Sequence, residues 1–412
     1  MSDVELSRFF LSLVVLLSAA LLFGRIFDFL RLPRVIGEIF AGLLLGPSLF
    51  GFFLPEQQAW LFRGFATQPV LLSTFYWLGL ILLMFTAGLK GRSEFTGADR
   101  KLVGVLVIGS ILLPLLIGWF CAPLFSTAQK GDALAFQIVV AIAVSVTSIP
   151  VISRIFIDLG MMETRFAQIT VAAATIQDLA LWVLLAIATA LQRGEAARPI
   201  DQLAIVGYTL VFAVASVLLG PMLLRIAGRL SAQALTEASL TGYALLVCLV
   251  FVALASLLHV NVVFGALLAG IIIGRFTDPR LAAVKQRIGD LAIWFFVPIY
   301  FAIVGQRIDL YRDFDAALCF GFLLLSSIVK IISIVSAARL ARRPWQEAVD
   351  FGVAMNTRGG PGIVLASVAH GAGIIDDRFF LALILASILT SLGAGLWFRW
   401  RLARGADFQL GV

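Results

Sequence analysis

Long runs of apolar residues separated by short polar connections dominate the chain. Thirteen such windows occur, near residues 9–25, 35–54, 68–89, 102–125, 134–157, 166–190, 203–224, 238–258, 261–275, 290–306, 315–338, 348–370 and 379–398. A helix of about 20 mostly apolar residues crosses a bilayer, and most windows approach that length. Because the runs are continuous and do not alternate, they exclude an outer-membrane barrel. The pattern predicts an all-α polytopic membrane protein with about thirteen transmembrane helices.

The composition is typical of a membrane protein and argues against other classes of protein. Hydrophobic residues make up 61% of the 412 residues and charged residues 13%, with a mean hydropathy of +1.03, a balance that soluble domains do not have. The chain has no glycine-rich phosphate loop after a strand, no paired metal-ligating histidines and no nucleophile–base constellation. We therefore expect neither an enzyme nor an ATP-driven pump, and no bound cofactor. The three cysteines lie in apolar windows and are expected to pack.

Positive charges are unevenly distributed between the connections. Of the 31 Lys and Arg residues, 21 lie in one alternate set of connections and 8 in the other. Cytoplasmic connections carry the excess of Lys and Arg. We therefore expect the N-terminus outside and the C-terminus in the cytoplasm of a cell (inner or plasma) membrane. The net charge of +7 reflects this bias, and we expect no nucleic-acid partner.

Two windows contain helix breakers at mid-membrane. In window 134–157, Thr147 and Ser148 precede Pro150, and proline removes a backbone donor and clashes with the carbonyl four residues earlier. Window 348–370 contains NTRGGPG at residues 356–362. Non-helical backbone at this depth must be buried in protein or line a cavity. The two breaks are seven windows apart and therefore run in opposite directions, as in transporters with inverted-topology repeats.

A single charge, Asp178, lies at the centre of window 166–190, directly after Gln177. A carboxylate at mid-membrane is costly unless it is neutralised, hydrated or paired, so its presence points to function. The alternative is a structural hydrogen bond made by a protonated carboxyl group. Because the broken windows offer partners for an ion, we interpret Asp178, together with its neighbour Gln177, as the ion- and proton-binding residues, with no catalytic residue in the chain.

Lys330 and Arg358 are the Lys and Arg residues that lie well inside a window, away from its ends. Both should face the protein interior. Half-helix ends at a crossing carry partial charges, so a cation can compensate a negative end. We expect Lys330 to be structural in this way, and for Arg358 the structural and functional interpretations both stay open.

Several stretches resemble one known family. They are SVTSIPVISRIFIDLG, TIQDLALWVLLAIA, RVIGEIFAGLLLGPSLFG, LGLILLMFTAGLKG, HVNVVFGALLAGIIIGR, FFVPIYFAIVGQRIDL and MNTRGGPGIVLASVAHGAGII. Together they are similar to the monovalent cation:proton antiporter-2 family, which includes potassium/proton efflux antiporters. The resemblance covers nearly the whole membrane chain.

The resemblance implies the sodium/proton-antiporter fold, with two crossed broken helices. It implies a core transport domain that includes about 134–190 and 315–398, a dimerisation panel from the remaining spans, and a homodimer in membrane lipid. It also implies that Asp178 is the ion-binding carboxylate, with Thr147 and Ser148 beside it. The residues that would support the broken helices and compensate their charges are Pro150, Asn356, Thr357, Arg358 and Lys330.

Three departures from the family pattern matter. Gln177 stands where many electrogenic relatives have a second carboxylate, and Lys90 stands where the third-window motif usually ends in glutamate. We also expect no soluble regulatory domain in residues 1–412, which puts direct nucleotide gating in doubt and leaves room for a separate regulatory subunit.

These features predict a mechanism of exchange. Burial disfavours the charged carboxylate, so a proton and a monovalent cation compete for Asp178. With one carboxylate, the two loaded forms carry equal charge, which predicts electroneutral 1:1 exchange by alternating access unless Lys330 or Glu38 also couples to transport. The oxygens of Asp178, Thr147 and the opened carbonyls suit an alkali cation. K⁺ is favoured over Na⁺ only because the Gln177–Asp178 pair resembles the potassium-efflux group.

Other transport classes remain as alternatives. A K⁺ efflux channel-like protein would need a continuous pore, and the sequence has no carbonyl-filter motif of the known type. A proton- or sodium-coupled carrier of an organic anion would use Arg358 to clamp a carboxylate. A non-transporting sensor would keep the fold without the activity. The intact Asp178 and both breaks favour the antiporter.

Overall fold

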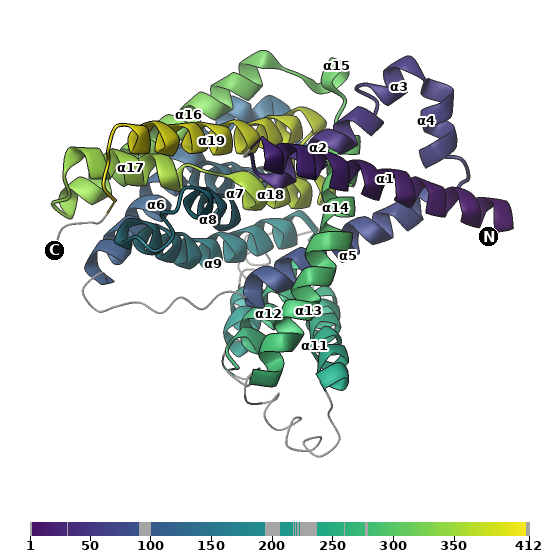
Figure 1. Ribbon diagram of the computed structural model, residues 1–412, viewed down its shortest axis with the longest axis horizontal. Helices are drawn as coiled ribbons and strands as arrows, with labels where there is room; N and C mark the ends of the chain where they lie inside the picture. Colours follow the sequence, from purple (N-terminus) through teal and green to yellow (C-terminus); the bar gives the residue numbers. More distant parts are fainter. Residues whose placement is uncertain are drawn as a thin grey trace. The chain divides into compact units, whose positions relative to one another are not determined.

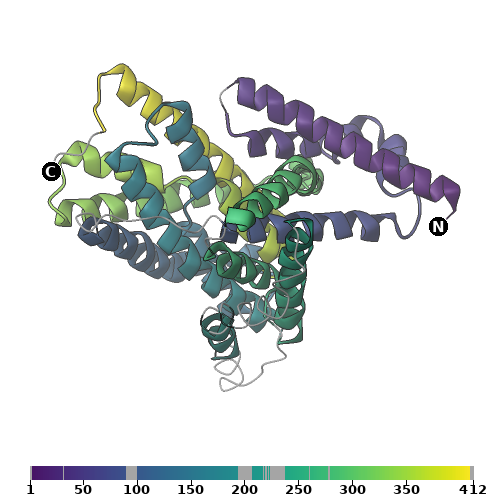
Figure 2. The ribbon, with the colours of Figure 1, turned by 60° about the horizontal axis from the view of Figure 1, so that its bottom comes forward.

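The chain folds into helices throughout the parts that the structure describes. The computed structural model describes residues 2–30, 32–89, 100–193, 207–216, 237–258, 260–276 and 279–408, and the single positions 218, 220 and 222. Every regular element in these parts is helical, and an isolated β-bridge joins Gln129 to Ile375 (Figures 1 and 2). Lys90 lies outside the described residues.

The helices fall on the predicted windows. Ten helical spans in the described residues are long and apolar enough to cross a membrane, when Arg34–Phe53, Ala133–Asp158 and Leu281–Gln306 are each counted as one. The remaining three windows hold the shorter apolar helices Gly207–Ser216 and Val262–Gly274, and the pair Trp345–Met355 and Gly359–Gly371. The prediction of an all-α, multi-pass membrane protein is confirmed.

The chain divides into two compact units. Unit 1 comprises Met1–Ile26, Gly37–Arg92 and Arg193–Asp309, and unit 2 comprises Phe27–Ile36, Ser93–Gln192 and Leu310–Val412. The transport role of the predicted core domain and the dimerisation role of the remaining spans stay predictions.

Unit 1 holds most of α1 (Asp3–Phe29) and α2 (Arg34–Leu45). Its other described elements are α3 (Phe50–Phe53), α4 (Pro55–Phe62), α5 (Gln68–Leu89), the helix Gly207–Ser216, α11 (Glu237–Leu257), α12 (Val262–Gly274), α13 (Pro279–Leu291), the π-helical segment Ala292–Phe296 and α14 (Val297–Gln306). Helices α5 and α12 pack backbone to backbone, because a Cβ at Gly88 would lie 2.4 Å from the Leu267 carbonyl oxygen. Small residues permit this close helix association in membranes.

Unit 2 repeats one order of helices twice. The first set is α6 (Arg100–Cys121), the broken pair α7 (Ala133–Ser145) and α8 (Ile149–Asp158), and α9 (Arg165–Arg193), with the 3₁₀ helix Ala122–Ala128 between α6 and α7. After α15 (Leu310–Asp313), the second set is α16 (Ala316–Leu340), the broken pair α17 (Trp345–Met355) and α18 (Gly359–Gly371), and α19 (Asp377–Ala403). Helix α6 packs against α7 and α16, and α19 packs against α16 and α18 (Figure 1).

Aromatic rings pack one half of each broken pair, α8 and α17, against α9 and α19. The buried ring of Phe166 on α9 contacts Phe156 on α8, Phe351 on α17 and Phe398 on α19, with ring centroids 4.5–5.8 Å apart. Burying such rings and pairing them contributes more than their area alone. Both breaks are therefore held between well-packed helices.

Candidate ion-binding site

The first break separates α7 from α8 at residues 146–148. The Ser148 hydroxyl oxygen caps α8 by accepting a hydrogen bond from the Val151 N–H at 3.4 Å, and Pro150 lies in the first turn, where a missing N–H costs no helical bond. The predicted opening near Thr147 is confirmed.

The second break separates α17 from α18 at residues 356–358. The Ser148 N–H donates to the Thr357 carbonyl oxygen at 2.6 Å, so the two breaks touch where they cross. Gly359 has φ +34°, and a Cβ there would lie 2.3 Å from Cγ2 of Val151 and 2.7 Å from Oγ of Ser148. Glycine therefore allows the backbones to approach this closely.

Two cations compensate the C-terminal end of α7. The last carbonyls of a helix have no partner within it and carry partial negative charge. Arg358 donates from Nε to the Ala143 oxygen at 3.2 Å and from Nη2 to the Val144 oxygen at 3.4 Å. Lys330 Nζ donates to the Ser145 oxygen and, at 3.0 Å, to the Ser110 oxygen on α6.

Neutral hydroxyls meet the equivalent end of α17. The Thr147 hydroxyl donates to the Met355 oxygen at 2.7 Å, and the Thr357 hydroxyl donates to the Ala354 oxygen at 2.9 Å. The side-chain oxygen of Asn356 is buried and has no hydrogen-bond partner in the described part of the chain. The Arg358 backbone N–H donates to the Thr390 hydroxyl on α19 at 3.3 Å.

Gln177 attaches α9 to the crossing. Its side chain is fully buried, and its amide donates to the Ser145 carbonyl oxygen. Its Oε1 lies 3.1 Å from the Thr147 hydroxyl and 3.3 Å from Lys330 Nζ, which donates to it. Gln177 thus shares its partners with the side chains that hold the two breaks together.

Asp178 faces a different surface of α9. Its partly exposed side chain lines a small open recess, whose empty space of about 220 Å³ includes the space open to the surroundings. The other lining residues are Ile142, Val146, Leu181, Trp182, Leu185, Pro361 and Leu365. The Lys330 ammonium attracts the carboxylate electrostatically, but within the described residues Asp178 makes no hydrogen bond and no ion pair. The carboxylate is therefore available to a proton or a cation.

A second membrane carboxylate, Asp350 on α17, shows the opposite arrangement. Arg401 on α19 donates from Nε to Oδ1 at 3.0 Å and from Nη2 to Oδ2 at 2.9 Å, and the Trp397 indole donates to Oδ1 at 2.8 Å. Asp350 is 2% exposed. Because both its oxygens are occupied by this bidentate pair, Asp350 joins α17 to α19 and is a poor candidate for ion binding.

The structure brings some predicted residues together and separates others. Thr147, Gln177, Lys330 and Arg358 meet at the crossing, Ser148 and Pro150 start α8, and Asp178 lies in the recess. Their roles in binding ions stay predictions. Sequence reasoning missed Thr390, because one hydroxyl among several on α19 carries no distinguishing pattern. It expected opened carbonyls at the breaks but could not say which of them Lys330 and Arg358 contact.

Two further observations concern possible ion-binding sites away from Asp178. In the described parts of the chain, no three His, Cys, Asp or Glu side chains gather where they would hold a metal ion. Glu38, the other acidic residue with a conceivable part in transport, is buried in α2.

The crossed breaks in paired repeats place the chain among membrane proteins with the sodium/proton-antiporter fold. The structure of the sodium/proton antiporter MjNhaP1 from Methanocaldococcus jannaschii matches with a TM-score of 0.69 at 16% identity, over 96% of this chain and 97% of that chain. The family described as sodium/hydrogen exchanger, transmembrane, matches residues 14–404. The chain belongs to this sodium/hydrogen exchanger family.

Relatives in sequence extend the comparison. The K⁺/H⁺ antiporter 1 of Saccharomyces cerevisiae is 30% identical over 383 residues, which cover 89% of this chain and 43% of that protein. The Na⁺/H⁺ antiporter NhaS4 of Synechocystis is 28% identical over 393 residues, which cover 92% of this chain and 94% of that protein. The chain spans less than half the length of the yeast relative and about half that of similar plant cation/H⁺ antiporters.

Proposed function

We propose that the chain exchanges a monovalent cation for a proton at Asp178 by alternating access. The observation that carries this proposal is a carboxylate that makes no hydrogen bond and no ion pair in the described chain, placed next to a helix crossing whose own charges are compensated. A bare carboxylate in a low-dielectric barrier is penalised far more than a protonated or cation-loaded one. The site therefore crosses the barrier only when one of its two substrates is bound.

Charge counting supports an electroneutral 1:1 cycle. Lys330 and Arg358 are committed to the α7 carbonyls, and the neighbour of Asp178 is the neutral Gln177. If these groups keep their protonation states, the proton-loaded and cation-loaded sites carry the same charge. Each cycle then moves one cation against one proton with no net charge.

The identity of the cation has weaker support. Oxygen ligands suit alkali ions, the yeast relative is named a K⁺/H⁺ antiporter and the Synechocystis relative a Na⁺/H⁺ antiporter. We favour K⁺ over Na⁺ because of the Gln177–Asp178 pair. The proposal also includes a homodimer in the cell membrane, with the N-terminus outside and the C-terminus in the cytoplasm.

The organic-anion carrier has less support than the antiporter. Arg358 is 1% exposed and already donates to two carbonyls at the end of α7. Breaking those contacts to clamp a substrate carboxylate would leave buried carbonyls unpaired, at a cost of about 1–3 kcal/mol each.

Proteoliposomes with a preset pH gradient test the proposal. K⁺, Na⁺, Rb⁺ or Li⁺ is added to wild type, to Asp178→Asn and to the control Asp377→Asn, whose carboxylate is mostly exposed at the start of α19. We expect alkali cations to dissipate the gradient in wild type and in the control, and Asp178→Asn to lose at least 100-fold in rate. Transport currents on a solid-supported membrane should stay at background.

Each result is decisive for one part of the proposal. Cation-dependent proton movement by Asp178→Asn at the wild-type rate would remove Asp178 as the exchange site. A current that scales with transport would contradict electroneutral exchange and would implicate a second titrating group. A wild-type protein that moves protons with none of these cations would contradict the antiporter itself.

A further inference from the structure

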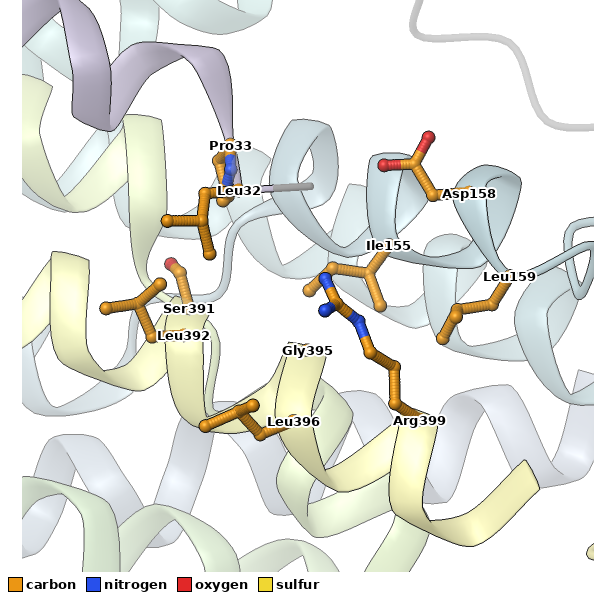
Figure 3. Close-up of a pocket in the computed structure, with 10 residues that line it drawn as sticks. All are labelled: Leu32, Pro33, Ile155, Asp158, Leu159, Ser391, Leu392, Gly395, Leu396 and Arg399. Carbon is orange, nitrogen blue, oxygen red and sulfur yellow. The ribbon is translucent and has the colours of Figure 1, made fainter. Parts of the chain in front are cut away.

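A second cavity of unit 2 shares no lining residue with the recess at Asp178. This cavity is an open recess rather than an enclosed void, and its empty space of about 510 Å³ includes the space open to the surroundings. It lies between the end of α8, the second half of α19 and the connection from α1 to α2 (Figure 3). The lining residues are Leu32, Pro33, Ile155, Asp158, Leu159, Ser391, Leu392, Gly395, Leu396 and Arg399.

One face of α19 forms a groove that ends in a cation. Ser391, Gly395 and Arg399 are spaced four residues apart and therefore share a face of the helix. A Cβ at Gly395 would meet no atom within 4 Å, so this glycine borders open space. The Ser391 hydroxyl donates to the Ser387 oxygen of its own helix at 2.6 Å, which leaves a largely apolar groove.

The Arg399 side chain reaches into this cavity. In Figure 3 its guanidinium lies between α19 and α8, near Ile155, and the Asp158 carboxylate points away from it. Asp158 pairs with Arg154 at 2.9 Å, and Arg154 also lies 3.8 Å from Asp28. Asp158, the carboxylate that lines the cavity, is therefore paired with Arg154. A guanidinium has five donors, so it can contact the protein and a phosphate at the same time.

Further arginines lie at the same ends of the helices of unit 2. Arg339 is in the last turn of α16, Arg401 is in the last turn of α19, and Arg404 follows α19 directly. The charge distribution predicts that these ends face the cytoplasm, where the membrane leaflet carries anionic lipids. An apolar cavity with a cation at this level matches a molecule that has an acyl chain and an anionic head.

We infer that this cavity binds one anionic phospholipid, with an acyl chain along the leucines of α19 and α8 and the phosphate on Arg399. A free phosphate would gain nothing from the apolar walls, whereas a lipid uses both parts of the cavity. The bound lipid would touch α8, α19 and the α1–α2 connection together, and would stabilise their packing. This inference depends on the membrane location of the chain and not on the transported ion.

Lipid-dependent thermal unfolding of the full chain in detergent tests the inference. Phosphatidylglycerol is compared with phosphatidylcholine of the same acyl chains and with inorganic phosphate, and native mass spectrometry counts bound lipid. We expect phosphatidylglycerol to raise Tm by several degrees and to remain bound as one molecule. Phosphatidylcholine and inorganic phosphate should shift Tm by less than a third as much.

Two variants with matched controls locate the effect. Arg399→Gln removes the cation, and its control Arg404→Gln changes an arginine whose guanidinium carbon lies 4.2 Å from the centre of the Trp400 ring and which does not line the cavity. Gly395→Leu fills the groove, and its control Gly393→Leu also enters open space but lies outside the cavity lining. We expect both cavity variants to lose the phosphatidylglycerol shift and both controls to keep it.

Three outcomes would overturn the inference. Equal stabilisation by the two lipids would remove the role of Arg399 in recognising a phosphate. If the rise in Tm with phosphatidylglycerol persists in both cavity variants, the lipid binds elsewhere. If inorganic phosphate raises Tm equally, the acyl chain does not contribute to binding. Because the readout is stability and bound mass, these outcomes are separate from any failure of cation exchange.

Discussion

The two broken helices of unit 2 have the same plan but different chemistry at their crossing. In each, the first half ends in carbonyls that have lost their helical partners. The end of α7 is met by the charged side chains of Lys330 and Arg358, whereas the end of α17 is met by the hydroxyls of Thr147 and Thr357. Both cations come from the second repeat, so that repeat compensates the charge of the first.

This asymmetry bears on how the site can work. Lys330 and Arg358 already donate hydrogen bonds to the carbonyls at the negative end of α7, so an incoming cation gains little from those carbonyls. Asp178, on the first repeat, is then the group whose charge remains to be neutralised. A symmetrical crossing with hydroxyls at both ends would leave the α7 carbonyls to compete with Asp178 for the cation.

Among the variants that test this difference between the two helix ends, Lys330→Met should lose the most stability. The variant loses three charge-assisted hydrogen bonds of about 1.5–3 kcal/mol each, and regains the several kcal/mol that burying an ammonium costs. We expect a net stability loss on the order of 1–4 kcal/mol, measured by thermal unfolding in detergent, and at least tenfold slower exchange.

Lys285→Met is the matched control for this variant. Lys285 also donates to two carbonyls, those of Gly274 and Phe276, but it is partly exposed. Water can replace its ammonium, so the loss should stay below about 1 kcal/mol. Equal losses of stability in Lys330→Met and Lys285→Met would mean that the hydrogen bonds of Lys330 at the crossing contribute no more than those of a partly exposed lysine.

An intermediate effect should come from Gly359→Ala. The added Cβ would lie 2.3 Å from Cγ2 of Val151, at a residue with positive φ. Overpacking and backbone strain together predict a destabilisation of about 1–3 kcal/mol. Gly360→Ala adds the same atom where nothing lies within 4 Å, and should be neutral or stabilising by up to about 1 kcal/mol. Unfolding of the two variants in chemical denaturant measures these free energies. Similar free energies of unfolding for Gly359→Ala and Gly360→Ala would contradict the close approach of the two backbones at the crossing.

The smallest effect should come from Thr147→Val. The variant loses the neutral hydrogen bond to Met355, and hydrogen bonds between membrane helices contribute about 0.6 kcal/mol on average and up to ~1.7 kcal/mol. Thr170→Val is its control, since the Thr170 hydroxyl donates only to Phe166 of its own helix. A Thr147→Val loss as large as that of Lys330→Met, measured in the same thermal assay, would refute the contrast between charged and neutral caps.

The sequence made the breaks visible because their causes are local. Pro150 and the residues 356–362 disturb any helix that contains them, and Asp178 is conspicuous in an apolar window whatever surrounds it. The partners at the crossing were not visible in the same way. Lys330 lies 220 residues from Ser110 and 185 from Ser145 along the chain, and a carbonyl leaves no mark in a sequence.

Two adjacent residues, Gln177 and Asp178, also show what the sequence reveals and what it does not. Gln177 and Asp178 were predicted to serve one ion site, but successive residues of a helix point about 100° apart. The structure directs Gln177 to the crossing and Asp178 to the recess. The one-dimensional pattern contains both residues but not the direction in which either faces.

By itself the sequence determined the membrane class, the helical windows, the two breaks and the lone mid-membrane carboxylate of the first repeat. Apolar run length, proline and buried charge act within a few residues, so their consequences can be derived without a fold. Only the tertiary structure decided which helix end each cation compensates and that Asp350 is paired while Asp178 is not. Those assignments depend on contacts between distant segments, which exist only once the two repeats have packed together.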